Sequence, residues 1–392
     1  MSKTIALCAS HVLTGSQLTD LGNGCVLVTD GRIEKIMTQD DLKTMGSLDN
    51  IEVIDLGHRT LLPGMIECHN HIGMDARLAH HLEMMEHCEC ELTVTALNAL
   101  KDDLISGVTT ARSMGDRFYI DVHLRGEIQN GRVAGPNILA AGIGMRSMHG
   151  HGFVGLPHCG VENLRRTCRS NIARGVNMLK LFVTPGMPPI SGDFVPHYLT
   201  REEIATVVRE AASVNIPTAA HCIGGQGLAD CLSEGVDVIE HAYSVTESDI
   251  ELLLKHDSWV DLTSGIILDP SREEFLSERG AAHTRACREA TFRRLEKLVK
   301  SGVKFTLGTD AYHGMLYREV EYAVELGASN LTAVQGVTTN AARMCRIDKA
   351  TGSIAQGLAA DLIAVESNPL DNVSALSQVA FVMKGGSIVK HS

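Results

Sequence analysis

Short apolar runs alternate with longer segments of helical periodicity from about residue 60 onward. Runs rich in β-branched residues, separated by helical patterns, are typical of repeated βα units around a parallel sheet. We count eight such runs, at 65–71, 107–114, 137–144, 177–183, 216–222, 236–243, 258–264 and 303–310. Eight units predict a closed (β/α)₈ TIM barrel over residues 58–345, with a doubly wound open sheet as the structural alternative.

The helical segments between the runs support this count. One of them, at 200–213, begins with Thr200 and Glu203 in the spacing of a capping box. Its apolar residues then recur at helical spacing, which predicts a helix with one face on the barrel.

The two ends of the chain have a different pattern. Residues 1–57 contain short alternating segments such as "CVLVTDGRIEKI" with an Asp-Gly turn, and residues 346–392 contain "ADLIAVE" and "VAFVMKGGSIVK". Alternation broken by tight turns is typical of antiparallel hairpins. We therefore predict that both ends together form one small β-sandwich domain beside the barrel.

Composition narrows the range of partners. The chain has 392 residues, 44% of them hydrophobic, with 35 Lys and Arg against 47 Asp and Glu, for a formal net charge of −12. No basic cluster offsets this charge and no run of 18 apolar residues occurs, so we expect neither nucleic acid nor a membrane as partner. A small-molecule substrate and self-association into a homo-oligomer are expected instead.

The N-terminus and the cysteines predict a location. The first residues, "MSKTIALCASHVLTGSQL", lack the sustained apolar core and the small-residue cleavage site of a signal peptide. The 11 cysteines are odd in number, and the pair Cys88 and Cys90 does not form a C-x-x-C motif. Free thiols in a reducing compartment fit best, which predicts a cytoplasmic protein.

Ionisable residues recur where the predicted strands end. Functional groups of a (β/α)₈ enzyme come from the C-terminal ends of its strands. Five candidates occupy such positions, and a lysine inside the fourth strand can reach the same end. The six residues are His69, His71, Lys180, His221, His241 and Asp310.

Each candidate has a structural alternative. His69 and His71 point to the same side of a strand and can share a metal ion, but they could also be a hydrogen-bonded pair in a loop. A buried histidine is often a satisfied core residue, and Asp310 could cap the following helix. Lys180 is harder to explain structurally, because an unpaired charge within "NMLKLFV" would cost several kcal/mol. The joint occurrence of five residues at strand ends and a lysine that can reach the same end favours a functional site.

Several motifs resemble one family along nearly the whole chain. They are "LLPGMIECHNH", "GVTTARSMGD", "KLFVTPG", "AAHC", "IEHA", "FTLGTDA", the "HGHG" at 149–152 and the tail "TTNAARMCRIDKATGSIAQGLAADLIAVESNPL". The chain resembles the amidohydrolase superfamily, in the binuclear subtype with a carboxylated lysine. The resemblance is to the imidazolonepropionase-related amidohydrolases, including the prolidase-like or Xaa-amino-acid dipeptidase groups.

This resemblance implies a metal site. It implies two divalent ions, with zinc as the expected metal, held by His69, His71 and Asp310 on one side and by His221 and His241 on the other. Lys180 is expected to bridge both ions as a carbamate. Carboxylation answers the buried-lysine problem, because it converts the cation into an anionic oxygen ligand.

The implied chemistry is hydrolysis of an amide bond. A hydroxide that bridges the metals would be the nucleophile, and Asp310 would act as general base and then as general acid. His149 or His151 would hydrogen-bond the developing oxyanion. The expected enzyme is therefore a binuclear hydrolase acting on carbon–nitrogen bonds, specifically a prolidase-like dipeptidase.

Two departures from the prolidase-like pattern leave other functions open. Ile223 stands where relatives often have tyrosine, and "TPGMPPISGD" replaces the usual Gly-Gly turn after Lys180. A deaminase or a cyclic-amide ring-opening hydrolase acting on a small heterocycle is one alternative. Lys180 argues against it, as does Gly224 in the place where such enzymes often carry glutamate. A catalytically inert binding protein on the same fold is another.

The loops at the strand ends predict the substrate. They carry cationic or hydrogen-bonding side chains together with adaptable methionines, which suits a small dipeptide or N-acyl amino acid with its carboxylate on an arginine or histidine. The candidates are Arg112, Arg146, His313, Met145, Met148 and Met187.

Overall fold

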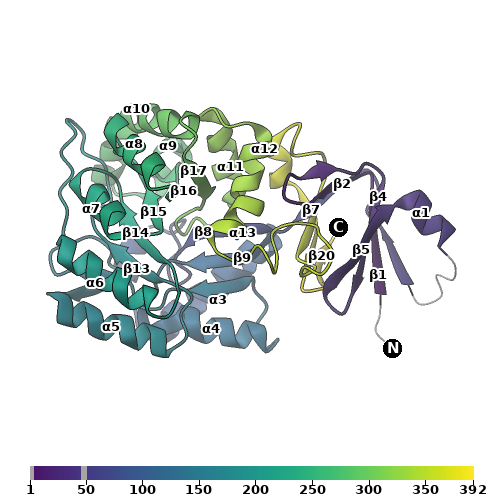
Figure 1. The fold of residues 1–392 in the computed structure, drawn as a ribbon, viewed down its shortest axis with the longest axis horizontal. Helices are drawn as coiled ribbons and strands as arrows, with labels where there is room; N and C mark the ends of the chain where they lie inside the picture. The colour runs from purple at the N-terminus through teal and green to yellow at the C-terminus, as the bar shows by residue number, and fades with distance from the viewer. Residues whose placement is uncertain (1–3, 46–50) are drawn as a thin grey trace.

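A barrel and a β-sandwich lie side by side in the protein (Figure 1). The computed structural model describes residues 4–45 and 51–392. The central part of the chain forms the barrel, and the two ends of the chain meet in the sandwich.

The barrel has eight parallel strands, one inside each of the predicted runs. They are β8 (Met65–Asn70), β9 (Val108–Ser113), β10 (Asn137–Ala140), β13 (Leu179–Phe182), β14 (Thr218–Cys222), β15 (Val238–His241), β16 (Trp259–Leu262) and β17 (Lys304–Leu307). These strands confirm the predicted (β/α)₈ architecture, and not the alternative of a doubly wound open sheet.

The barrel sheet consists of two parts, and a hydrogen bond joins them at each of their two junctions. Strands β10, β9 and β8 form one part, and β13 to β17 belong to the other. The Asp310 N–H donates to the His69 carbonyl at 2.9 Å, which brings the end of β17 to β8. On the opposite side the Asn177 N–H donates to the Ala140 carbonyl at 2.7 Å, just before β13. These contacts close the circle of strands.

Helices surround the barrel on its outer side (Figure 1). The Thr200 side chain accepts from the Glu203 N–H in a complete capping box, as predicted. Two short strands that the sequence analysis did not predict, β11 (Met145–Ser147) and β12 (Leu156–His158), pair with each other after β10. The helices after β8 are α2 (His81–Met84), α3 (Glu89–Ile105), α4 (Ile120–Gln129), α5 (Val161–Ala173), α6 (Arg201–Ala212), α7 (Gln226–Glu234), α8 (Glu247–Lys255), α9 (Gly265–Leu268), α10 (Glu278–Lys300), α11 (Leu316–Glu325), α12 (Asn330–Gly336) and α13 (Thr339–Met344), with 3₁₀ turns at Arg117–Tyr119, Pro270–Phe275 and Val373–Ser377.

The sandwich is built from two sheets that share one apolar core. The first has the order β5-β4-β1-β6, and the second the order β20-β19-β18-β7-β2-β3. Leu7 and Val26 from the first sheet belong to the same buried cluster as Leu362 and Phe381 from the second. The bounds are β1 (Thr4–Ala9), β2 (His11–Thr14), β3 (Thr19–Asp20), β4 (Gly24–Thr29), β5 (Arg32–Thr38), α1 (Gln39–Thr44), β6 (Ile51–Asp55), β7 (Thr60–Pro63), β18 (Leu362–Val365), β19 (Val379–Lys384) and β20 (Ser387–His391).

One strand of the sandwich lies beyond the domain boundary predicted at residue 58. Strand β7 lies within the range predicted for the barrel, yet it pairs with β18 and with β2. It therefore belongs to the sandwich sheet, and the chain enters the barrel at β8. None of the helices in the described ranges is long and apolar enough to cross a bilayer. The cytoplasmic location and the homo-oligomer stay predictions.

Candidate active site

Four histidines from three strands meet at one end of the barrel. His69 belongs to β8 and His71 directly follows it, while His221 lies on β14 and His241 ends β15. The ring centroids of His69 and His71 lie 5.4 Å apart, those of His69 and His241 4.6 Å, and those of His221 and His241 4.5 Å. The strand register thus places the predicted histidines in one continuous cluster.

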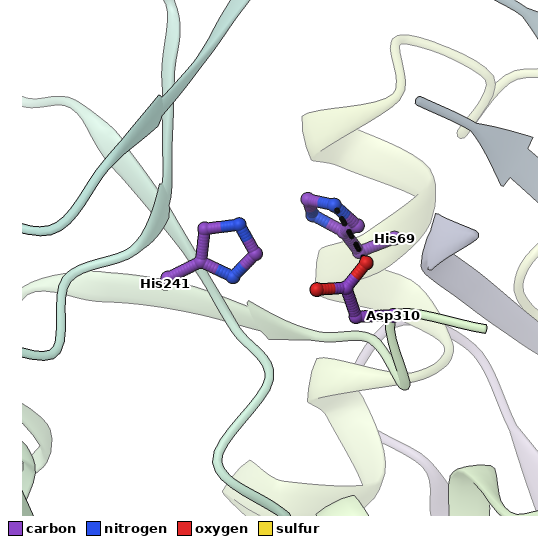
Figure 2. Close-up of side chains that lie close together, drawn as sticks. All are labelled: His69, His241 and Asp310. Atoms are coloured by element: carbon purple, nitrogen blue, oxygen red, sulfur yellow. Dashed lines mark ion pairs between the residues drawn. The ribbon is translucent and has the colours of Figure 1, made fainter. Parts of the chain in front are cut away.

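Asp310 joins this cluster from the segment after β17. Its Oδ1 atom lies 3.6 Å from the Nε2 atom of His69 and 3.6 Å from that of His71. Figure 2 shows the rings of His69 and His241 beside the Asp310 carboxylate. These three residues offer donor atoms that all lie within 4.8 Å of one another, which is close enough to hold one metal ion.

The backbone is strained at two of the site residues. His241 has a φ of 78° and Asp310 a φ of 56°, in the left-handed region that residues with a Cβ atom rarely adopt. Such conformations cost about 1–3 kcal/mol each and persist where the surrounding structure holds them. Both residues belong to the group of three whose donor atoms lie within 4.8 Å of one another.

Each histidine is held by a partner on the side away from the cluster. His69 Nδ1 donates to Glu240 Oε2 at 2.8 Å, and His71 Nδ1 donates to the Gly115 carbonyl at 2.8 Å. His221 Nε2 donates to the Pro185 carbonyl at 2.9 Å. These acceptors fix the proton on one ring nitrogen, so the other nitrogen keeps its lone pair. Metal-ligating histidines are typically oriented in this way.

His241 is oriented by a hydroxyl instead. Its Nδ1 atom lies 2.8 Å from Thr263 Oγ1. The Tyr243 hydroxyl donates to the Thr263 carbonyl at 2.9 Å and also contacts Thr263 Oγ1. A chain of two hydroxyl side chains therefore sets the ring orientation of His241.

Lys180 lies buried beside the same cluster, where its Nζ atom lies 5.1 Å from the ring centroid of Phe182 but has no hydrogen-bond partner in the described residues. Its side chain is fully buried on β13. Burial lowers the pKa of Lys180 to about 8. An amine with a lowered pKa is more often neutral, which is the form that reacts with CO₂.

The acid–base properties of the cluster suit a bound cation. Burial lowers the pKa of His71 to about 3 and holds the pKa values of His69 and His241 well below their usual range. The neutral imidazole that results is the form that ligates metals. Burial also raises the pKa of Asp310 to about 6, while the Lys180 charge opposes this shift.

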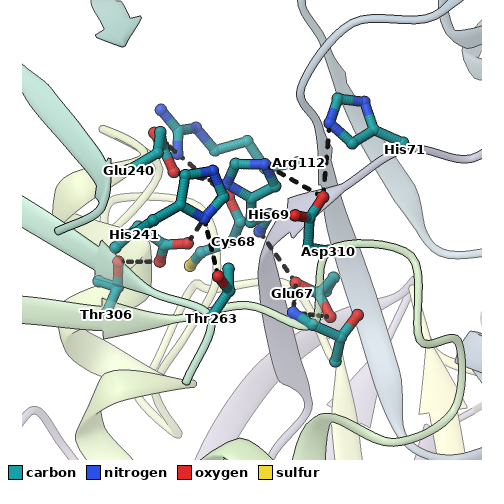
Figure 3. A network of polar contacts seen from close by, with 12 residues as sticks. Glu67, Cys68, His69, His71, Arg112, Glu240, His241, Thr263, Thr306 and Asp310 are labelled. Carbon is teal, nitrogen blue, oxygen red and sulfur yellow. Dashed lines mark hydrogen bonds and ion pairs between the residues drawn. The ribbon is translucent and has the colours of Figure 1, made fainter. Parts of the chain in front are cut away.

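A buried charge network beneath the histidines was missed by the sequence analysis. Glu240 accepts from Arg112 at 3.0 Å with one oxygen and from His69 with the other (Figure 3). Asp261 lies 3.9 Å from His69 Nδ1. Glu240 could have been identified from the sequence, because a carboxylate in the apolar run "VDVIEHAY" raises the same question as Lys180 in its own run.

A cavity of about 320 Å³ opens beside the cluster. His69, His71, His221, His241 and Asp310 all face it. Its other walls come from loops after β8, β11, β13, β16 and β17 and from α10. The metal-ligand candidates thus lie against a space that can take a small molecule.

The structure separates the two histidines predicted to stabilise an oxyanion. His151 lines the cavity, and its ring centroid lies 4.7 Å from that of His221. His149 does not line the cavity; its Nδ1 atom lies 2.8 Å from Ser147 Oγ and its ring packs against Tyr198.

The predicted substrate anchors are mostly wrong. Arg112 is fully buried and paired with Glu240, and Met145 belongs to the apolar core. Both ring nitrogens of His313 are engaged, one with Asp103 at 3.1 Å and the other with the Met74 carbonyl at 2.8 Å. None of these three side chains lines the cavity.

Of the remaining three predicted pocket residues, one lines the cavity and two do not. Met187 lines the cavity as predicted. Arg146 donates to the Ser147 and Gly150 carbonyls, and Met148 is 63% exposed, so neither lines it. Strand ends could be located by their pattern, but the directions of these other side chains could not, even where they lie on a strand, as Arg146 does on β11.

Comparison with known proteins gives a family and a set of relatives. The sequence model described as "Amidohydrolase family" matches residues 60–389. Ochratoxinase from Aspergillus niger is 26% identical over 414 residues, which cover 94% of this chain and 83% of that protein. A crystal structure of a Xaa-Pro dipeptidase with bound methionine has a TM-score of 0.86 at 24% identity, covering 99% of this chain and 100% of that one. A structure of molinate hydrolase has a TM-score of 0.83 at 19% identity, covering 99% and 95%.

Proposed function

Because the chain belongs to the amidohydrolase family, we propose that it hydrolyses a carbon–nitrogen amide bond of a small molecule with the help of two divalent cations. Zinc is the expected metal, since imidazole and carboxylate donors suit it. The names of the relatives, ochratoxinase and Xaa-Pro dipeptidase among them, support hydrolysis of small substrates.

The buried amine of Lys180 carries this proposal. A fully buried lysine without a hydrogen-bond partner in the described ranges would be costly as a bare cation. Carboxylation would turn it into a carbamate with two oxygen donors, and would leave no unpaired charge once cations are present. The donor set therefore fits a binuclear centre with a carboxylated Lys180.

The remaining donors divide into two groups. His69, His71 and Asp310 would hold one cation, and His221 and His241 the other, with the Lys180 carbamate shared between them. Two bound cations would polarise the substrate carbonyl and activate a water molecule. The protein side chains supply orientation and proton transfer.

Asp310 is positioned to move the proton. In our proposal it accepts a proton from the attacking water and delivers it to the leaving nitrogen. The water oxygen bonds to the carbonyl carbon, the C–N bond breaks, and the products are a carboxylic acid and an amine. His151, which lines the cavity, is the histidine we assign to the carbonyl oxygen.

The dipeptide or N-acyl amino acid stays a prediction. Of the side chains predicted to bind its carboxylate, His151 lines the cavity, while Arg112, Arg146, His149 and His313 do not. We therefore propose hydrolysis of an amide bond without requiring a carboxylate on the substrate.

Metal analysis combined with an amide panel tests the proposed function. We expect about two equivalents of metal per chain after saturation, release of amine from acyclic amides, and loss of activity in a chelator that added zinc reverses. A stoichiometry that stays near one would contradict the binuclear centre. Ammonia released from heterocycles, with no acyclic amide cleaved, would favour the deaminase.

A further inference from the structure

The walls of the cavity away from the metal cluster are dominated by apolar side chains. Met74 and Met85 come from the segment after β8, Phe153 from the segment after β11, Met187 from that after β13, and Ile266 and Leu276 from that after β16. Leu82 and Phe153, which also line it, are 55% and 52% exposed. The apolar lining thus extends to the solvent-facing side of the cavity.

No lysine or arginine of the described chain lines this cavity. Arg272 lies behind one wall, 3.9 Å from the ring centroid of Tyr312, but it is paired with Glu319 at 2.9 Å. Arg146 lies 5.4 Å from the Phe153 ring centroid and binds backbone carbonyls. Neither guanidinium group lines the cavity, although Arg272 Nε and Nη1 and Arg146 Nε have no hydrogen-bond partner in the described residues.

The histidine at the outer part of the cavity does not supply a cation either. His81 Nδ1 donates to the Leu78 carbonyl at 3.1 Å, and burial lowers the pKa of His81. A substrate carboxylate placed here would lose its hydration without gaining an ion pair.

Thr284 adds a polar group to a wall that also carries His81, His151, Tyr243 and Tyr312. Thr284 on α10 lines the cavity and is 1% exposed, and its Oγ1 atom has no hydrogen-bond partner within residues 4–45 and 51–392. Buried hydroxyls are usually paired. The Oγ1 atom itself exposes less than 1 Å², so a substrate atom reaches it only when neighbouring side chains of the wall shift.

We infer that this site selects uncharged, apolar amides, and that Thr284 is a specificity-determining residue that hydrogen-bonds one neutral polar atom of the substrate. The inference rests on the proposed amide hydrolysis and adds the class of substrate. Methionine side chains adapt to ligands of different shape, so the pocket accepts aryl or alkyl groups on the amide.

A set of matched anilides tests the charge preference. The compounds are 4-methylacetanilide, the neutral 4-acetamidobenzamide and the anionic 4-acetamidobenzoate, and the measurement is kcat/KM from release of the aniline. We expect the methyl compound to exceed the carboxylate by about 10-fold or more, because the carboxylate loses water without a partner. The benzamide should fall between them, because it is polar but uncharged.

The outcomes separate this inference from the proposed function. A preference for the benzoate would overturn the inference and leave amide hydrolysis intact. If none of the anilides is cleaved and the amide panel also fails, the proposed function is wrong. The thermal shift that each compound produces still ranks the neutral and anionic ligands in that case, and a larger shift with the benzoate would again overturn the inference.

Two substitutions probe the charge of the wall. Met187→Lys places an ammonium in the cavity and should move the ratio of kcat/KM values toward the benzoate by about 10-fold. Ile190→Lys adds the same charge to the same loop, but Ile190 is 58% exposed and does not line the cavity. It should change the ratio by about 2-fold or less, because a solvent-exposed charge is screened. Equal effects of both would show that the cavity wall does not set the preference.

A second pair of variants isolates the hydroxyl. Thr284→Val should lower kcat/KM for the benzamide by about 5- to 10-fold, the effect of one lost hydrogen bond, and change that for 4-methylacetanilide less. Thr291→Val is the control, because Thr291 lies on the same helix, is also buried with an unpaired Oγ1 in the described structure, and does not line the cavity. If Thr284→Val lowered kcat/KM equally for both compounds, the hydroxyl would not form a hydrogen bond that distinguishes between the substrates.

Discussion

The strand-end cluster and the apolar cavity beside it differ in how the fold positions them. The cluster takes its ligand candidates from strands, or from residues one to three positions beyond a strand, where hydrogen-bond register fixes the backbone. The cavity takes most of its walls from loops and short turns between strands and helices. In such a fold the strands can therefore hold the catalytic residues in one arrangement, while differences in the loops change which substrate binds.

The largest expected effect comes from removing the shared ligand of the cluster. Lys180→Ala should lower kcat/KM by about 10³-fold or more and reduce the metal content, because the carbamate would contribute to both cations. Acetate or propionate should partly restore activity by filling the space that the lysine leaves. Metal analysis and kinetics with and without acetate measure both effects.

Lys304→Ala is the matched control for this variant. Lys304 also lies on a barrel strand, but it pairs with the exposed Asp257 at 2.7 Å. Its loss should change activity little, since exposed ion pairs contribute about 1 kcal/mol or less. Wild-type turnover in Lys180→Ala would show that the buried amine is structural. It would contradict the proposal that Lys180 is a ligand shared by both cations.

The next largest effect is expected from a variant of Asp310 that separates its role in proton transfer from its role in metal binding. Asp310→Asn keeps one oxygen donor but removes the base, so kcat should fall by about 10²-fold while most of the metal is retained. Metal content and kcat are measured on the same preparation, with the 85%-exposed Asp257→Asn as control. An unchanged kcat would move the general base elsewhere in the cavity, with His151 as the first candidate.

The contrast between strands and loops also explains what the sequence could predict. His69, His71, His221 and His241 could be placed together because period-two strands and the barrel rule leave few arrangements. Asp310 followed from its place at the end of the last run. The structure brings all of them to one cavity, while their role as metal ligands stays a prediction.

Side chains outside the ligand cluster could not be placed in the same way, whether on a strand, as for Arg112 on β9, or in a loop. Arg112 was assigned to substrate binding because it lies near a strand end, but its side chain turns inward to Glu240. His313 was assigned likewise, and Asp103 from α3 engages it instead. In both cases a partner distant in sequence decides the orientation, and no local pattern records that partner. Adaptable apolar surface was predicted for the pocket, but of the three methionines assigned to it only Met187 lines the cavity.

A third substitution tests whether the charge network beneath the cluster stabilises the fold. Glu240→Gln removes the carboxylate that pairs with Arg112 at 3.0 Å and leaves Asp261 as the nearby buried carboxylate, so the free energy of unfolding should fall by on the order of 3 kcal/mol. Glu366→Gln breaks the ion pair of a partly exposed carboxylate with Arg59 and should cost about 1 kcal/mol or less. Chemical denaturation of both variants measures the difference, and equal losses would mean that the buried pair contributes no more than the partly exposed one.

The smallest expected effect concerns the orientation of a single ring. Thr263 Oγ1 holds His241 Nδ1 at 2.8 Å and is itself held by Tyr243, so Thr263→Val removes the group that sets the ring without touching the cavity wall. Loss of an outer partner of a metal-ligating histidine typically lowers metal affinity by about 10- to 100-fold. We therefore expect activity to be near normal at saturating zinc but to require about 10-fold more free zinc for half of its maximum. Thr291→Val, which removes a buried hydroxyl outside the cluster, should leave this zinc requirement unchanged. If Thr263→Val binds zinc like the wild type, the strained backbone at His241 is sufficient to orient the ring, and the hydroxyl chain serves the fold alone.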